Sequence, residues 1–113
     1  MYRKLSRESS IRRSILAGIC KDVIMNEGVT TTEARAKEVR KFVDKMITYG
    51  KSGSLVSRRK ALAFLHNDKK VVDKVFNELA PRYAERNGGY TRIIKLNERK
   101  GDDALQVRLE LVD

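Results

Sequence analysis

The chain has 113 residues, with 25 Lys or Arg against 15 Asp or Glu, so its formal net charge at pH 7 is +10. This length suits one domain over residues 1–113, and 41% apolar residues are too many for a disordered basic tail. A field of this sign repels copies of the chain and attracts polyanions, so we expect no obligate homo-oligomer. Because no apolar run approaches the roughly 18 residues of a membrane span and no signal-peptide pattern is present, we expect a cytoplasmic protein without a membrane partner.

The reactive residues are few. The single Cys20 and the single His66 are too few for an internal disulfide or a structural zinc site, and Cys20 falls on an apolar helical face, where it would pack as a small hydrophobe. No phosphate-binding GxxxxGK[ST] loop, GxGxxG turn or HExxH helix occurs. We therefore expect no enzymatic activity, no cofactor, no metal and no small-molecule substrate.

The chain begins with YRKLSRESSIRRS, in which five basic residues face one acid. We expect a basic arm at about 1–9. Beyond it, apolar residues recur with the period of a helix, which predicts an amphipathic helix at about 10–26, capped by Ser9 or Ser10 and ended by Gly28.

In that placement Arg12 and Arg13 lie in the first turns of the helix. Cations are slightly disfavoured there by the helix dipole, and a phosphate bound between the arginines and the unpaired N–H groups would offset the cost. The arm would then become ordered on a phosphate-bearing partner.

The next segment, VTTT, is β-branched and predicts a short strand. Thr32 would cap a second helix at about 33–49, and Gly50 would end it. The residues expected to face the core from this helix are Val39, Phe42, Val43, Met46 and Ile47.

Two further helices follow the flexible turn KSGS. The third helix would place one apolar side inward, formed by Leu55, Val56, Leu62 and Leu65. Asp68 would cap the fourth helix, which should stop or kink near residue 79 because Pro81 lacks an N–H, with a last turn at about 81–86.

The C-terminal segments 87–97 and 104–112 read as strands joined by the loop ERKGD, because the second alternates strictly between apolar and polar residues. They predict a hairpin whose residues Leu105, Val107, Leu109 and Leu111 face the helices.

Basic residues outnumber acidic ones on the N-terminal segment, the second helix, SRRK and the region 82–100. An ordinary solvated surface mixes both signs of charge, so this excess favours a surface that binds nucleic acid. RNA is favoured over DNA because no helix-turn-helix spacing, zinc finger or leucine zipper is visible. The alternatives are a DNA-binding or nucleoid-associated basic protein and an RNA-processing enzyme. Tyr83 and Tyr90 could stack on unpaired bases or pack in the core, and the sequence leaves this open.

The segment NGGYTR is interpreted as a contact loop. Two glycines permit positive φ and let backbone N–H groups approach a phosphate, while the guanidinium groups of Arg82, Arg86 and Arg92 could converge there. The alternative is that Gly88 and Gly89 end a helix and Tyr90 packs on the core.

Three stretches resemble, in order and across nearly the whole chain, the family of bacterial large-subunit ribosomal protein seventeen. These stretches are RKLSRESSIRRSIL, VTTTEARAKEVRKFVDKMIT and VFNELAPRYAERNGGYTRIIKLNERKGDDALQVRLELVD. The resemblance implies an α+β fold with a helix, a short strand, three helices and a C-terminal β-hairpin, in which helices pack on a three-stranded mixed sheet. It also implies a structural constituent of the large ribosomal subunit that binds large-subunit ribosomal RNA on the solvent side, near the peptide tunnel exit, beside other ribosomal proteins.

Charge, loop chemistry and the resemblance together select one set of expected RNA-contact residues. They are Arg3, Lys4, Arg7, Ser9, Ser10, Arg12, Arg13, Arg35, Lys37, Arg58, Arg59, Lys60, Arg82, Arg86, Gly88, Gly89, Tyr90, Thr91 and Arg92.

Overall fold

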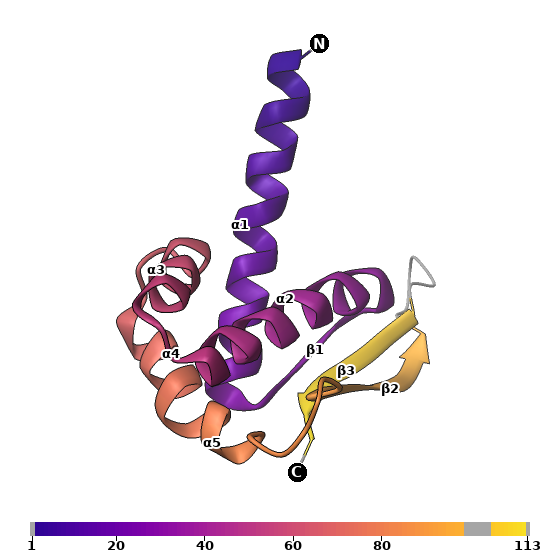
Figure 1. Cartoon of the computed structure of the whole chain (residues 1–113). Helices are drawn as coiled ribbons and strands as arrows, with labels where there is room; N and C mark the ends of the chain where they lie inside the picture. The colour runs from indigo at the N-terminus through magenta and orange to yellow at the C-terminus, as the bar shows by residue number, and fades with distance from the viewer. Residues whose placement is uncertain (1, 99–104, 113) are drawn as a thin grey trace.

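The computed structural model describes residues 2–98 and 105–112, with side chains described for 11–96 and 105–112 (Figure 1). Its elements, in chain order, are α1 (Tyr2–Asn26), β1 (Gly28–Thr32), α2 (Glu33–Ser52), α3 (Leu55–Phe64), α4 (Lys69–Lys74), the π-helical turn η1 (Val75–Leu79), α5 (Ala80–Arg82), β2 (Thr91–Glu98) and β3 (Leu105–Leu111). The expected α+β order, with a C-terminal hairpin, is confirmed. The loop ERKGD lies outside the described residues.

The described strands form a three-stranded sheet in the order β1-β3-β2, with β3 in the centre. Both pairings are antiparallel, and Leu109 of β3 lies opposite Val29 on one side and Ile93 on the other. The expectation of a mixed sheet is therefore wrong, because β1 and β2 run in the same direction but never pair with each other. The inward alternation of β3 is confirmed, since Val107, Leu109 and Leu111 are buried and Leu105 is partly buried.

One apolar core joins the helices to the inner face of the sheet. α1 contributes Cys20, Val23 and Ile24 to it, at the 3.6-residue spacing of an amphipathic helix. The predicted inward residues of α2 also lie there, four of them fully buried and Phe42 partly buried, where it stacks on Phe64 with ring centroids 4.8 Å apart. The helical periodicity of the sequence was therefore interpreted correctly for both long helices.

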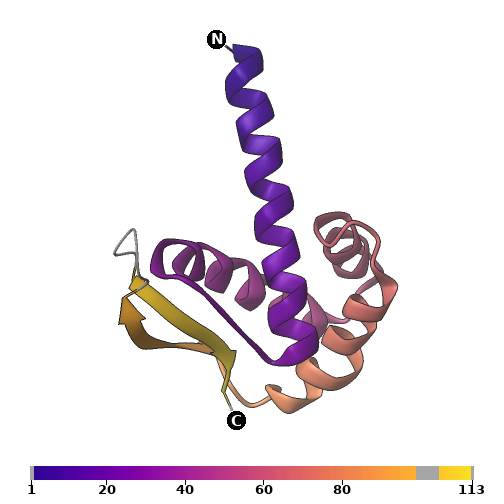
Figure 2. The ribbon, with the colours of Figure 1, turned by 180° about the vertical axis from the view of Figure 1, so that it is seen from behind.

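α1 differs from the prediction at both ends. It begins at Tyr2 rather than near residue 10, so Ser9 and Ser10 lie inside the helix and do not cap it. Its N-terminal half projects away from the rest of the fold, as Figures 1 and 2 show. The helix ends before Glu27, which takes the left-handed conformation with φ 62°, while Gly28 is already the first residue of β1. The expected ordering of the arm on a partner stays a prediction.

α2 ends later than predicted. Gly53, with φ 68°, is the left-handed residue that closes the helix, and its N–H donates to the carbonyl of Tyr49. Gly50 is instead buried within α2, where an added Cβ would lie 3.1 Å from Val75 Cγ1 and 3.2 Å from Ala80 Cβ. Glycine is needed there for close helix packing and not for a turn. Thr32 occupies the N-cap position, but its side chain makes no capping hydrogen bond.

α3 does not bury the apolar side that was predicted. Leu55 and Val56 are 63% and 59% exposed, whereas Ala61 and Leu65 are buried. The first turn, capped by the Ser54 hydroxyl that accepts from the Ser57 N–H, lies away from the core. Tertiary packing, and not periodicity, decides which turns of this short helix are covered.

The capping role of Asp68 is confirmed, because its carboxylate accepts from the Val71 N–H. The expected stop or kink near residue 79 appears as the π-helical turn η1, in which the Ala80 N–H donates to the Val75 carbonyl. This wider turn ends at Leu79, two residues before Pro81, and the chain remains helical through Arg82 although proline lacks an N–H.

Candidate nucleic-acid interface

The first group of expected contact residues lies along α1. Arg3, Lys4, Arg7, Ser9 and Ser10 fall on its N-terminal part, where side chains lie outside the described set. Arg12 and Arg13 are exposed, but they lie in the middle of the helix. A phosphate at the helix N-terminus therefore cannot explain them, and that part of the prediction is wrong. Their exposure still leaves both guanidinium groups accessible to an anion.

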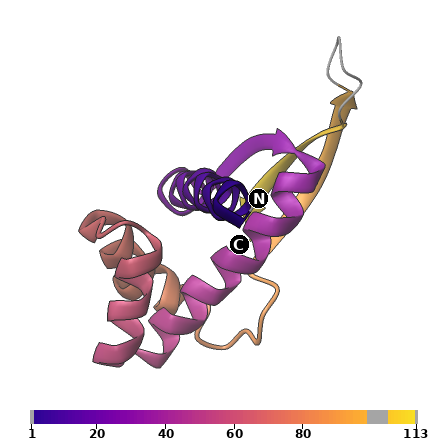
Figure 3. The same cartoon turned by 90° about the horizontal axis from the view of Figure 1, so that it is seen from above.

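Figure 3 looks nearly along α1 and shows α2 passing beside it. Side chains of the two helices enclose a groove of about 340 Å³. It is lined by the apolar residues Ile11, Ile15, Leu16 and Ala34 and by the charged residues Arg12, Arg35 and Glu38. Arg12 forms an ion pair with Glu38 across the groove and remains 65% exposed. This pair links the two basic helices at the base of the α1 projection.

The outer side of α2 carries a row of exposed cations. Arg35, Lys37, Arg40, Lys41 and Lys45 are all exposed. Lys37 pairs with Glu33 at 3.3 Å, one turn earlier, and it is the one member of this row with an acid within 4.0 Å among the described residues. Together with Arg12 and Arg13 of α1, this row gives two adjoining helices an excess of positive charge. Such a distribution favours the binding of a polyanion.

The basic run of α3 divides into two kinds of residue. Arg58 hydrogen-bonds the Asp73 carboxylate of α4 and lies over the Phe76 ring, 5.3 Å from its centroid. Arg59 and Lys60 are exposed, and no described acid pairs with either. Arg58 therefore holds α3 against α4, and its two neighbours remain accessible to an anionic partner.

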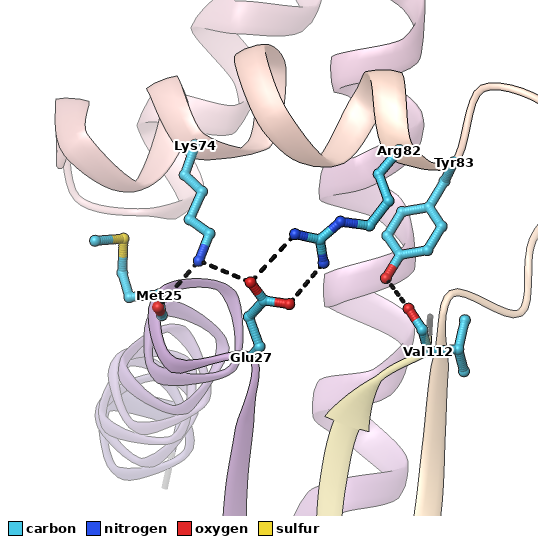
Figure 4. A network of polar contacts seen from close by, with 6 residues as sticks. All are labelled: Met25, Glu27, Lys74, Arg82, Tyr83 and Val112. Atoms are coloured by element: carbon cyan, nitrogen blue, oxygen red, sulfur yellow. Dashed lines mark hydrogen bonds and ion pairs between the residues drawn. The ribbon is translucent and has the colours of Figure 1, made fainter.

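Arg82 is exposed but is paired with an acid of the same chain (Figure 4). Its Nη1 and Nη2 donate to the two carboxylate oxygens of Glu27 at 2.6 and 3.2 Å. Lys74 Nζ adds a contact at 3.5 Å to Glu27 and donates to the Met25 carbonyl at 3.0 Å. The hydrogen bond from Arg82 is the largest cause that lowers the pKa of Glu27. This cluster joins the α1–β1 junction to α4 and α5.

The loop that precedes β2 is held by a buried tyrosine. Tyr90 is 3% exposed, and its hydroxyl accepts from Lys51 Nζ at 3.0 Å and donates to the Arg86 carbonyl at 3.2 Å. Tyr83 is 2% exposed and donates to the Val112 carbonyl, as Figure 4 shows. The alternative of packing is confirmed for both rings, and stacking on RNA bases is wrong. Thr91 is buried as well.

Gly88 and Gly89 have φ values of 77° and 63°, which confirms the expected left-handed backbone, and no described atom lies within 4 Å of an added Cβ at either. The expected convergence of three arginines is wrong. Arg82 binds Glu27, Arg92 binds Glu110, and Arg86 Nη1 lies 3.5 Å from the Gly89 carbonyl. The loop therefore offers backbone groups and Arg86, without a cluster of guanidinium groups.

Sequence reasoning missed Arg108, whose Nε donates to the Glu110 carboxylate at 3.4 Å on the outward face of β3. The sequence did indicate that Arg108 lies on the outward face, because it occupies a polar position in the alternating run ALQVRLELV. Only the pairing of the strands shows that Arg92 and Arg108 share one acid.

The reactive residues show no catalytic arrangement. Cys20 is fully buried, and burial raises the pKa of its thiol to about 12. His66 is exposed at the turn after α3. Within the described ranges, no group of three or more His, Cys, Asp or Glu side chains could hold a metal ion. No helix described here combines the length and the apolar character needed to cross a membrane.

The chain matches known proteins over almost all of its length. A family model described as ribosomal protein L17 matches residues 15–112. The large ribosomal subunit protein bL17 of Ligilactobacillus salivarius is 56% identical, over 99% of this chain and 98% of the relative. Those of Caldanaerobacter subterraneus and Fusobacterium nucleatum are 57% and 55% identical, over 98% of this chain and 98% and 95% of their own lengths. The chain belongs to the ribosomal protein L17 family.

Proposed function

We propose that this protein is a structural constituent of the bacterial large ribosomal subunit, where it binds and stabilises folded ribosomal RNA. Ribosomal protein L17 is a structural family, so the chain is not an enzyme. The observation that supports RNA binding most directly is the run of exposed cations on two adjoining elements, α1 and α2. We place the protein in the cytoplasm, on the solvent side of the subunit near the peptide tunnel exit, beside other ribosomal proteins, as the family resemblance implies.

The proposed mechanism is electrostatic. Folded RNA brings phosphates close together, and Lys and Arg side chains on a rigid domain neutralise them and release counterions. The residues proposed for these contacts include exposed side chains and a loop backbone: Arg12, Arg13, Arg35, Lys37, Arg59, Lys60, Arg86, Arg92 and the backbone of Gly88 and Gly89. Arg3, Lys4, Arg7, Ser9 and Ser10, on the projecting end of α1, are proposed from the sequence alone. Arg58, Arg82, Tyr90 and Thr91 support the fold and are left out of the set.

Salt dependence tests the mechanism. If about six phosphates are neutralised, the affinity for large-subunit ribosomal RNA should fall with a log–log slope of roughly −4 to −5. Replacing both Arg12 and Arg13 with Gln should make this slope shallower by nearly two. The matched control replaces Lys69 and Lys70, two exposed cations of α4, and should leave the slope unchanged. Equal slopes for the two double variants, with both folds intact by circular dichroism, would remove Arg12 and Arg13 from the contact set.

Sedimentation tests the location. In a sucrose gradient of native lysate at moderate salt, the protein should migrate with large subunits and should leave them only at high salt. Migration with the nucleoid would favour the DNA-binding alternative, and slow sedimentation of free protein at all salt concentrations would contradict a ribosomal role.

A further inference from the structure

The outward face of the sheet carries a second set of polar groups, separate from α1 and α2. Val107, Leu109 and Leu111 of β3 point into the core, so the alternate residues Arg108 and Glu110 point the other way. The other residues that alternation places on this face, Thr30, Arg92 and Ile94, are exposed. Figure 2 shows β2 and β3 at the edge of the molecule, beside α2. This surface is open to a partner.

Two guanidinium groups share one acid on this face. Arg92 Nε donates to Oε1 of Glu110 at 2.9 Å, and Arg108 Nε donates to Oε2 at 3.4 Å. Glu110 is only 18% exposed, whereas Arg92 and Arg108 are 54% and 43% exposed. Each arginine uses its Nε, and no described residue accepts from its terminal nitrogens. The acid therefore orients two cations whose remaining donors face outward.

Gly28 of β1 leaves the space in which the Arg108 guanidinium lies. A Cβ added at residue 28 would come within 2.8 Å of Arg108 Cζ and nearer still to Nη2. Gly28 is not among the residues with positive φ, so its backbone conformation alone does not require glycine. The absence of a side chain lets the guanidinium rest against β1, while the Arg108 side chain remains 43% exposed.

An apolar surface lies on the same face of the sheet, on the strand at the other side of β3. Ile94 of β2 is opposite Arg108 in the strand pairing and is 41% exposed, and Leu96, two residues further along, is 42% exposed. A planar cation packed over β1 and aliphatic side chains on β2 share one open sheet face, and such a face suits an unpaired nucleobase, because bases stack on guanidinium planes and on apolar surfaces. Two cations against one carboxylate, in a chain of net charge +10, favour an anionic partner.

We propose that the open face of the sheet is a second RNA-contact surface, on which Arg108 stacks on an unpaired base and Arg92 binds the adjoining phosphate. This inference rests on the proposed function, since it assumes that the chain binds RNA. It assigns Arg108 and Glu110 roles that charge and motif alone do not indicate: Arg108 contacts the base, and Glu110 positions both arginines.

The test compares full-length variants for affinity and salt dependence, with purified large-subunit ribosomal RNA as the probe. Arg108→Ala should weaken binding about tenfold, the size expected for one stacked base. Arg108→Lys should lose nearly as much although it keeps the charge, and its salt slope should match that of the wild type. Gly28→Ala should also weaken binding, because its methyl group displaces the guanidinium. Lys70→Ala, on α4, is the control and should bind normally.

Several results would overturn the inference. Normal RNA affinity of Arg108→Ala would show that Arg108 does not contact the RNA. Normal RNA affinity of Arg108→Lys would show that Arg108 acts through its charge and not by stacking on a base. Unchanged RNA affinity combined with poor incorporation into large subunits would assign this face to a neighbouring protein. Thermal unfolding of each variant separates these results from misfolding. If the wild type binds the RNA without salt dependence, the proposed function is contradicted and so is this inference. If the wild type binds with the expected salt dependence and only the variants of the sheet face behave otherwise, the inference is contradicted and the proposed function is not.

Discussion

Replacing Glu27 with Gln should destabilise the fold through one identifiable cluster. The Glu27 carboxylate accepts two hydrogen bonds from Arg82 and lies 3.5 Å from Lys74 Nζ, and it joins the end of α1 to α4 and α5 (Figure 4). Gln keeps the shape of the side chain and can still accept one hydrogen bond, but it removes the charge. The substitution therefore tests the ion pairs without opening a cavity.

The expected magnitude follows from geometry and exposure. Hydrogen bonds to charged groups contribute roughly 1.5–3 kcal/mol when shielded from water, and exposed ion pairs about 0–1 kcal/mol. Glu27 is 44% exposed, so solvent screening places the loss between these limits, at about 1–2 kcal/mol. For a domain of this size, that corresponds to a fall in Tm of roughly 4–8 °C.

Calorimetry or circular dichroism at pH 7 measures this effect, with Glu38→Gln as the control. Glu38 also pairs with an arginine, but Arg12 is 65% exposed, so its loss should cost under about 1 kcal/mol. A Tm of Glu27→Gln within about 1 °C of the wild type would refute the role of the cluster. A double-mutant cycle with Arg82→Gln should show coupling of at least about 0.5 kcal/mol between the two residues.

The pH dependence gives an independent check with a definite sign. The hydrogen bond from Arg82 lowers the pKa of Glu27 in the folded protein. The stabilisation is therefore fully present above the unfolded pKa of about 4.3, and it is lost as the pH falls through the lower folded pKa. The difference in stability between wild type and Glu27→Gln should shrink in this acidic range. A difference that widened on acidification would contradict the assignment.

Three further predictions concern the core and the loop. Gly50→Ala should lower the Tm, because its methyl group would lie 3.1 Å from the Val75 carbonyl oxygen. Gly18→Ala, whose added Cβ has nothing within 4 Å, should raise the stability by about 0.5–1 kcal/mol. A higher Tm for Gly50→Ala than for Gly18→Ala would contradict the packing argument. Cys20 should react with a thiol reagent only on unfolding, because burial raises its pKa to about 12, and rapid labelling of native protein would show that α1 opens. Tyr90→Phe should cost about 1 kcal/mol by removing the hydroxyl that bonds Lys51, and an unchanged Tm would show that this hydroxyl does not stabilise the loop.

The sequence by itself determined the order of the elements and most of the core. Residues of α2 such as Val39 and Val43 recur at helical spacing, and Val107 and Leu109 of β3 alternate, so periodicity alone assigns them to buried faces. Element ends were predicted less well. A glycine can close a helix or permit close packing, and only the neighbouring helix distinguishes Gly53, which closes α2, from Gly50, which packs against Val75.

Charge and composition also indicated the proposed polyanionic partner, because net charge is a property of the whole chain that does not depend on how it folds. Which cations are accessible depends on the tertiary structure. Arg82 and Arg58 look like their neighbours in the sequence, but acids distant in the chain, Glu27 and Asp73, pair with them once the helices pack. Arg108 joins Arg92 only because β3 lies beside β2. Ion pairing and strand register are contacts between distant segments, and local sequence patterns carry no information on which segments will meet.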